Sequence, residues 1–449
     1  MHDGRRRVWL ISLVASVLAL ALGAPGEAAV RPRLSLVLPF DATGLPAADR
    51  WMGEGVAQII SLGLAQHAAF NQLEPARLPG LGHAEVWAAP AALQAARNVR
   101  ADVAIFGEIA RTGAELVVRP RLVEIKGSAG EPMALEPITV ADGELLARVA
   151  SAPVAYARTL KVPLTDAEAA RMEKTARPTR SLKAFELFSL AQSAARHGGQ
   201  EANERAADLL ARAVELDANF VVAQYTLGTV HQALGNRWKA AAQFRASTQL
   251  DPNYPEPYKA LGDLFLAQPR RLFDQAIEAY AKALELRPFL ADAHVGLGDA
   301  KASKGDTDGA IVAYQKALGL NPVNPRVHMS LGKIYYAEKG LYYEAVNAYK
   351  KAIEFDPTSV EARMGLGEVF EDKGLYTEAI EEYRKVIELD SKHTGAMYNL
   401  AVVYERVDPR EAMTQWERYI ALASQLPSEK DWVDVARQHL RKLKNQIKD

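Results

Sequence analysis

Apolar and small residues recur along most of the chain with a period near 34 residues. In each unit a Leu-Gly pair is followed by an alanine, an aromatic residue and usually a proline. This spacing places the apolar residues on one side of two successive helices, and the proline ends the second helix. We therefore predict stacked antiparallel hairpins, each of which buries its apolar face only against its neighbours. The Leu-Gly pairs begin at Leu227, Leu261, Leu297, Leu331 and Leu366, and the aromatic residues are Phe244, Tyr280, Tyr314, Tyr349 and Tyr383.

This pattern resembles the tetratricopeptide repeat over residues 184–426. The resemblance implies about six to seven repeats that form an all-α, right-handed solenoid. The first and last units depart from the pattern, as terminal repeats usually do. Residues 427–449 carry apolar residues at helical spacing with a polar reverse side, so we predict a helix that caps the array.

Two units are longer than the period requires. The unit at residues 255–290 has two extra residues and the unit at 325–359 has one. We place both insertions at the turn between the two helices, where an insertion least disturbs stacking. Gln268-Pro269-Arg270-Arg271 and the pair Tyr342-Tyr343 are then expected at hairpin tips.

Residues 31–163 lack the period and predict a small mixed α/β domain, so the fold class is an α+β multidomain protein. The prolines Pro120 and Pro137 indicate edge strands, and Pro153 indicates a kink in the last helix. Residues 164–183 are expected to be a linker. The predicted strands are 34–40, 103–109, 116–125 and 133–140, and the predicted helices are 48–66, 90–97 and 143–160.

The expected order βαβαβββα, with Leu38-Pro39-Phe40, Gly55 in a helix and the segment Ala101–Gly107, resembles the TolB amino-terminal-like domain. The resemblance implies a role in interaction or assembly and no known catalysis. Function carries over only loosely between proteins that share such a fold.

The first 29 residues have the layout of a signal peptide. Arg5, Arg6 and Arg7 precede an apolar run that ends at Ala24, and small residues follow at Gly26 and Ala28. We predict cleavage after residue 28 or 29 and a location in the bacterial periplasm or cell envelope. The alternative is an uncleaved membrane anchor, the one case in which membrane contact is expected. The Arg-rich start also resembles a twin-arginine export signal.

Composition and charge narrow the function. Lys and Arg number 54 against 55 Asp and Glu, so the net charge of −1 provides no basic field for nucleic acid. The chain has no cysteine, and its nine histidines show no metal-ligand spacing. Gly-x-Gly occurrences at Gly53, Gly80, Gly296 and Gly365 lack the third glycine of a dinucleotide loop. We predict no catalytic residues, no metal and no cofactor, and hence no enzyme.

The candidate site is the concave groove that the first helices form in this family. Its expected residues are Tyr225, Thr229, Lys259, Asp263, Asp299, Met329, Lys333, Tyr336, Met364, Glu368, Glu371 and Tyr398. If Gln232, Glu256, Asp292, Arg326, Glu361 and Glu405 are added, acids outnumber bases eight to three. This composition predicts a basic or amphipathic protein or peptide partner, although an ordinary solvated face would have similar residues.

Two expectations follow for the groove. Reversing the charges of Asp263, Asp299 and Glu368 together should weaken partner binding without changing the melting temperature. Lys259 has Asp263 one turn later, which argues against a pocket for a carboxyl-terminal carboxylate.

The sequence thus predicts an exported protein–protein interaction scaffold. The alternative is a sensor or signalling protein in which the α/β domain binds a small molecule.

Overall fold

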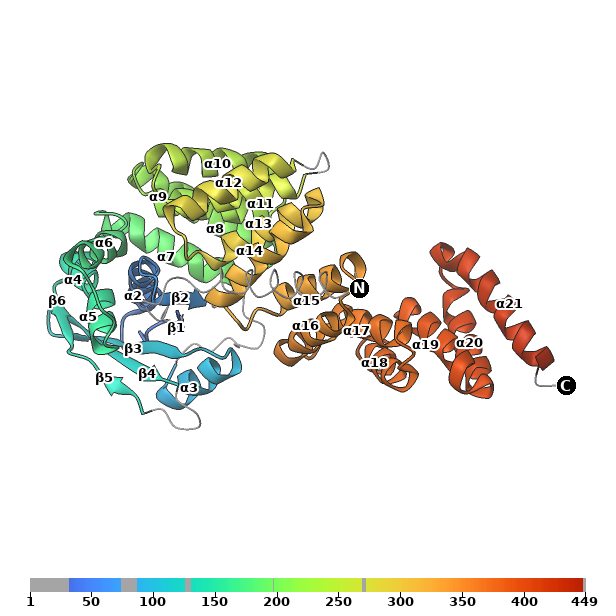
Figure 1. Ribbon diagram of the computed structural model, residues 1–449. Coiled ribbons are helices and arrows are strands. Elements are labelled where there is room, and N and C mark those ends of the chain that lie inside the picture. Colours follow the sequence, from blue (N-terminus) through green and yellow to red (C-terminus); the bar gives the residue numbers. More distant parts are fainter. Residues whose placement is uncertain (1–31, 74–86, 126–130, 197, 269–271, 447–449) are drawn as a thin grey trace, which may run out of the picture.

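The computed structural model describes residues 32–73, 87–125, 131–196, 198–268 and 272–446. The predicted signal peptide lies outside these residues. A small α/β domain comes first, and a long series of helices follows (Figure 1).

The α/β domain is built on one mixed sheet with the strand order β2-β1-β3-β4-β5, and β6 also pairs with β4. β1 runs parallel to β2 and β3, whereas β4 runs antiparallel to β3, β5 and β6. The strands are β1 (Arg33–Val37), β2 (Phe70–Leu73), β3 (Val103–Thr112), β4 (Glu115–Glu124), β5 (Met133–Ala134) and β6 (Ile138–Val140).

Helices cover both faces of this sheet, because apolar side chains alternate between the faces along each strand. Leu34 and Leu36 of β1 belong to a cluster with α3 (Ala89–Asn98) on one face. Val37 belongs to the cluster with α2 (Trp51–Leu64) on the other face.

Some predictions for this domain need correction. β4 is not an edge strand, because β3 pairs with one side of it and β5 and β6 pair with the other. Pro120, which has no N–H to donate, lies between the residues that pair with β5 and those that pair with β6. The predicted strand 133–140 is two short strands, and β2 had no predicted range.

The helical segment after the sheet also differs from the expectation. The predicted helix 143–160 is divided into a 3-10 turn, α4 (Leu145–Val149) and α5 (Ala152–Thr159), with Pro153 at the start of α5. The predicted linker contains α6 (Asp166–Ala176), which packs against α2 and α5. Thr165 and Glu168 form a capping box at its start.

The repeat array consists of seven helical hairpins and a last helix, within the part of the chain that the structure describes. Successive hairpins pack side by side. The hairpins are α7 (Leu182–Arg196) with α8 (Gln200–Leu216), α9 (Val221–Ala233) with α10 (Arg237–Leu250), α11 (Pro255–Leu266) with α12 (Phe273–Leu286), α13 (Ala291–Lys304) with α14 (Thr307–Leu320), α15 (Pro325–Lys333) with α16 (Tyr342–Phe355), α17 (Val360–Asp372) with α18 (Tyr376–Leu389), and α19 (Thr394–Val407) with α20 (Pro409–Ala423). The last helix is α21 (Lys430–Gln446).

The Leu-Gly pairs have the predicted packing role. In the hairpin of α13 and α14, Gly298 lies against the ring of Tyr314, so a larger residue would clash with it. Gly296, two residues earlier, lies against Tyr280 of the preceding hairpin. This Gly-x-Gly pair therefore lets one helix approach two aromatic rings, one in its own unit and one in the unit before.

The single-residue insertion at 325–359 lies elsewhere than predicted. A π-helical turn at Ile334–Glu338 absorbs the extra residue at the end of the first helix. Tyr342 and Tyr343 consequently begin α16 instead of forming the turn. The other insertion, near Gln268, extends into residues 269–271, outside the described part.

The α/β domain and the first hairpins share one hydrophobic core. Phe185 and Phe188 of α7 belong to the same buried cluster as Trp51 and Ile59 of α2. The rings of Trp51 and Phe185 meet edge to face with centroids 6.4 Å apart. The array then curves around the domain, and α17 to α21 extend away from it (Figure 1).

Candidate functional site

First helices of neighbouring hairpins contact one another, as α9 does with α11, α11 with α13 and α15 with α17, and we call the surface along the first helices the first-helix face. Near α7 to α15 this face meets the α/β domain of the same chain. The predicted groove residues are therefore divided between two environments, one beside the domain and one beyond it.

Contacts with the α/β domain follow the turns that end successive second helices. Gln66, just after α2, accepts a hydrogen bond from Arg287 after α12, with Nη2 and Oε1 3.2 Å apart. The side-chain amide of Asn71 in β2 donates to the carbonyl of Leu320 at the end of α14, at 3.1 Å. These turns repeat along the array, so the domain contacts equivalent positions in successive units.

The outermost contact is made by Arg100, which follows α3. Its guanidinium donates to the Glu354 carboxylate and to the Glu354 carbonyl, both at 3.1 Å, at the end of α16. It also lies 4.6 Å from the centroid of the Phe355 ring, a cation–π contact. Arg100 has a φ of 55°, a conformation that costs a non-glycine residue free energy. The domain thus reaches the fifth hairpin.

A cavity of about 640 Å³ remains between the α/β domain and the array. Tyr225 and Thr229, two predicted groove residues, line this cavity. They border the space between the array and the chain's own α/β domain.

The acids of the third and fourth hairpins are already engaged within the array. Asp263 forms an ion pair with Lys259, at 2.8 Å, and accepts a hydrogen bond from the Tyr280 hydroxyl at 2.7 Å. Asp299 pairs with Arg326 and accepts from the Tyr314 hydroxyl at 2.7 Å. Each carboxylate satisfies the hydroxyl of a buried tyrosine.

These bonds change the expectation for the triple charge reversal. Replacing Asp263 and Asp299 leaves two buried tyrosine hydroxyls without acceptors, which destabilises the fold. We now expect the triple variant to have a lower melting temperature, so it cannot separate binding from stability. Glu368 alone is the better probe.

Lys333 and Tyr336 also have intramolecular partners. Lys333 pairs with Glu361 of the next first helix. The Tyr336 hydroxyl donates to the Asp372 carboxylate at 2.6 Å. Asp372 was not among the predicted groove residues, although it directly follows Glu371.

Two half-buried acids of α17 lie close to further negative charge. Burial raises the pKa of the Glu368 carboxyl, and the charges of Glu371 and Asp372 raise it further, while Lys333 offsets part of this effect. Burial likewise raises the pKa of Glu371, although that carboxylate accepts a hydrogen bond from Tyr383 at 2.8 Å. An additional cation at this position would therefore be stabilised.

Apolar side chains of the C-terminal hydrophobic cluster lie on the same helix as these acids and on the neighbouring first helices. Met329 of α15 and Met364 of α17 are partly buried against the C-terminal hydrophobic cluster. Tyr398 of α19 belongs to the same region, and its ring centroid lies 5.0 Å from that of Trp416 and 5.4 Å from that of Trp432. Met364 and Glu368 are four residues apart, so they share one side of α17.

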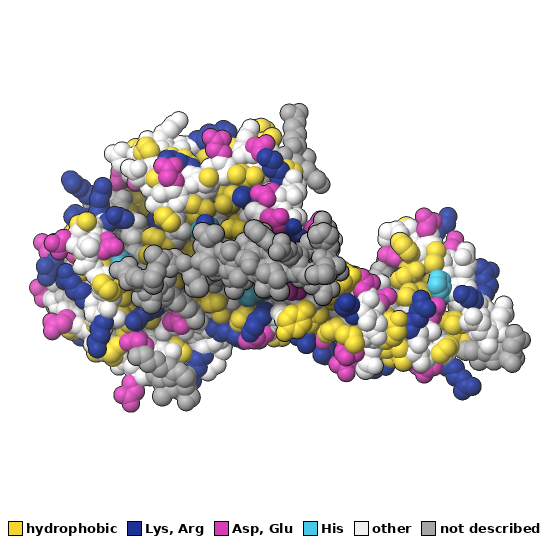
Figure 2. Space-filling view, viewed as in Figure 1, with side chains coloured by type: hydrophobic (Ala, Val, Ile, Leu, Met, Phe, Trp, Pro, Cys, Tyr) yellow, Lys and Arg dark blue, Asp and Glu magenta, His cyan; other side chains and the backbone are white. Residues whose placement is uncertain are grey.

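Other classes of site find no support in the described residues. They contain no group of three or more His, Cys, Asp or Glu side chains that could hold a metal ion. Among the described helices, none is long and apolar enough to cross a membrane. Figure 2 shows acidic and basic side chains interspersed over the visible face, without a large patch of one sign.

Comparisons with known proteins identify the repeats. Residues 298–338, 336–374 and 367–408 match the family model described as TPR repeat, and residues 225–291 match the model described as Tetratricopeptide repeat. The matched ranges do not include the α/β domain, so its resemblance to the TolB amino-terminal domain stays a prediction. Comparison with the curated proteins finds no match.

Several solved structures resemble the chain. MamA is 30% identical, with 37% of this chain and 95% of that chain covered and a TM-score of 0.34. YrrB, described as a TPR protein with an unusual peptide-binding site, is 26% identical over 41% of this chain and 93% of that one, with a TM-score of 0.37. The protein pilF of Pseudomonas aeruginosa is 16% identical over 50% and 97%, with a TM-score of 0.42. The family matches and the stacked hairpins together show that this chain is a tetratricopeptide repeat protein.

Proposed function

We propose that the protein is an exported scaffold that holds a basic, amphipathic segment of a partner protein on the first-helix face of α15, α17 and α19. The observation that carries this proposal is the environment of Glu368 and Glu371. Both are half-buried acids with raised pKa values, and methionine and tyrosine side chains of the C-terminal hydrophobic cluster lie on the same three helices. A lysine or arginine of a partner would stabilise their charges, and Met329 and Met364 would adapt to its apolar side chains.

The position of the α/β domain supports this choice of hairpins. The domain makes its contacts with the array at α7, at the turns after α12 and α14, and at the end of α16. The hydrophobic cluster of α17 to α21 draws its residues from α15 onward. The C-terminal hairpins thus form a second surface, and the α/β domain is the part we expect to attach the scaffold to another envelope component.

Export rests on the first 29 residues and their signal-peptide layout. Amino-terminal sequencing of the protein recovered from the periplasm or envelope tests this part. A start at residue 29 or 30 supports a cleaved signal peptide. A start at Met1 indicates an anchor, and recovery in the cytosol contradicts export.

Partner capture from cell envelopes tests the binding surface, with residues 30–449 as bait. Glu368→Lys should abolish recovery of a partner that the unchanged bait enriches, because it places a like charge opposite the partner's basic segment. Glu381→Lys is the matched control, since Glu381 is an exposed residue of α18 in the same hairpin. Cross-linking should then map the bound segment of the partner to a basic, amphipathic stretch.

Equal recovery with the wild-type bait and the Glu368→Lys bait would overturn the proposed surface. A mapped segment that is acidic would overturn the proposed chemistry. Both variants should keep the circular dichroism spectrum of the wild type, which separates a binding effect from unfolding.

A further inference from the structure

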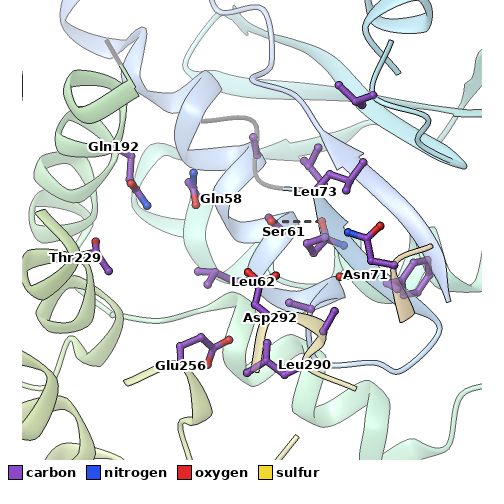
Figure 3. A pocket seen from close by; sticks show the side chains of 18 of the residues that line it. Gln58, Ser61, Leu62, Asn71, Leu73, Gln192, Thr229, Glu256, Leu290 and Asp292 are labelled. Atoms are coloured by element: carbon purple, nitrogen blue, oxygen red, sulfur yellow. Dashed lines mark hydrogen bonds between the residues drawn. The ribbon is translucent and has the colours of Figure 1, made fainter. Parts of the chain in front are cut away.

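The cavity between the α/β domain and the array has features of a small-molecule site. Its volume of about 640 Å³ falls within the range of about 300–1,000 Å³ that ligand pockets span. One wall consists of α2 and β2, and the other consists of α7, α9 and the turns between hairpins. Figure 3 shows Gln58 and Ser61 of α2 facing a space that Gln192, Thr229 and Glu256 of the array also border.

Four charged side chains in the cavity wall form two ion pairs within the protein. Glu54 of α2 pairs with Arg196 of α7. Glu256 of α11 pairs with Arg287, which is 6% exposed. At these four positions a ligand meets charges that are already compensated, and a charged ligand there would lose its hydration without gaining a counter-ion. The wall favours a neutral ligand.

Two polar atoms of this wall lack a hydrogen-bond partner among the described residues. They are Nε2 of Gln72, a donor, and Oε2 of Glu256, an acceptor, and both are shielded from solvent. Ser61 Oγ donates to the other end of the Gln72 amide, at 3.5 Å, as the dashed line in Figure 3 marks. A buried donor or acceptor without a partner costs free energy. Protein atoms close off both of these atoms, so a ligand's hydrogen-bond partners are the polar side chains that face the cavity.

The remaining lining residues fit the same chemistry. The amides of Gln58, Asn71 and Gln192 and the hydroxyl of Thr229 provide further donors and acceptors. Tyr225 and Tyr254 add aromatic surface, with ring centroids 5.7 Å apart, against which the C–H groups of a sugar ring can pack. We propose that the cavity between the α/β domain and the repeat array binds a neutral, polyhydroxylated small molecule, with the chemistry of a mono- or disaccharide.

Binding there would join the two parts of the protein. The ligand touches α2 and β2 on one side and α7 and α9 on the other, so it stabilises the arrangement in which the array curves around the domain. This inference does not depend on the partner surface at Glu368. It differs from a pocket within the α/β domain, because the array forms half of the wall.

Isothermal titration calorimetry on the full mature chain tests the proposal. The probes are glucose, N-acetylglucosamine, maltose, cellobiose and N,N′-diacetylchitobiose, with glucuronate and glucosamine as charged counterparts. We expect at least one neutral sugar to bind with one-to-one stoichiometry and to do so more tightly than the charged compounds. Gln58→Leu should weaken that binding about tenfold or more, because it removes an amide that faces the cavity and can hydrogen-bond to the ligand.

Two further variants keep the test independent of folding. Gln94→Leu makes the same change at an exposed residue of α3, outside the cavity wall, and should leave binding unchanged. Gln192→Trp fills the cavity from α7 and should abolish binding while the far-ultraviolet circular dichroism spectrum stays the same. The proposal is overturned if none of the neutral sugars binds, if the charged compounds bind more tightly, or if Gln58→Leu and Gln192→Trp bind as the wild type does.

Discussion

The two halves of the repeat array have the same hairpin design but different surroundings. From α7 to α14 the array shares its core with the α/β domain or contacts the domain at its turns. From α17 to α21 most buried apolar residues belong to the C-terminal cluster, to which α15 and α16 also contribute. The difference shows that a repeat pattern specifies how hairpins stack, but not which stretch of the surface is left for a partner.

The acids of the first-helix face show the same contrast on a smaller scale. Asp263 and Asp299 accept hydrogen bonds from buried tyrosines and pair with cations of the array. The equivalent residue of α17 is Glu368. There the hydroxyl of the buried Tyr383 donates its hydrogen bond to Glu371 instead. Equal charges at equivalent positions therefore hold a buried tyrosine hydroxyl in one half and not in the other.

The largest expected effect comes from truncating the aromatic core of each half. Phe185→Ala should cost about 3–5 kcal/mol of stability, because Phe185 is fully buried between α2 and the first hairpin. Hydrogen-exchange mass spectrometry should show lost protection in the sheet and in α7 to α9 together. Trp416→Ala should cost a similar amount of stability. The loss of hydrogen-exchange protection should then be confined to α17 to α21, since Trp416 belongs to the C-terminal cluster. Loss of protection in the sheet after Trp416→Ala would contradict the division into halves.

A smaller loss of stability should distinguish an acid that is bonded to a buried tyrosine, Asp263, from one that is not, Glu368. Asp263→Ala should cost about 1–3 kcal/mol, because it leaves the Tyr280 hydroxyl and Lys259 without their partner. Glu368→Ala should cost little, since its carboxylate is held at a raised pKa by burial and by neighbouring acids. Thermal unfolding of the two variants measures the difference, and equal losses would contradict it.

The smallest effect is a dependence on pH. The pKa of Glu368 in the folded protein lies above the ordinary value of 4.5, so the folded state binds this proton more tightly than the unfolded chain does. The stability that this proton contributes is present below pH 4.5 and is lost as pH rises through the folded pKa. Glu368→Gln should therefore gain stability relative to the wild type between pH 4.5 and pH 7, by an amount of order 1 °C in Tm. Glu381→Gln, an exposed control, should show no such trend.

Much of the array could be predicted from the sequence, because each contact there repeats with the period. The Leu-Gly pairs do lie against the aromatic rings that the spacing assigned to them. The tyrosine hydroxyls also needed acceptors once they were placed in a core, and this need alone would have assigned Asp263 and Asp299 a structural role.

The remaining features depend on contacts between distant segments, which carry no periodic signal. Strand β2 is four residues long, and α6 becomes part of the fold through its packing on α2. The contact of Arg100 with Glu354 joins residues 254 positions apart. The cavity lies between two regions that the sequence predicted as separate domains, so its wall could not be read from either one.

Site-specific cross-linking tests the central claim, that the α/β domain is docked on the array as far as the fifth hairpin. The chain has no cysteine, so Arg100→Cys combined with Glu354→Cys provides two unique thiols at the outermost contact. The hydrogen bonds of Gln66 and Asn71 and the shared core remain to hold the domain in place. The control pairs Arg100→Cys with Glu388→Cys, the equivalent position at the end of α18. A short bismaleimide should link the first pair within one molecule and leave the second unlinked, whereas equal linking of both pairs, or of neither, would contradict the docked arrangement.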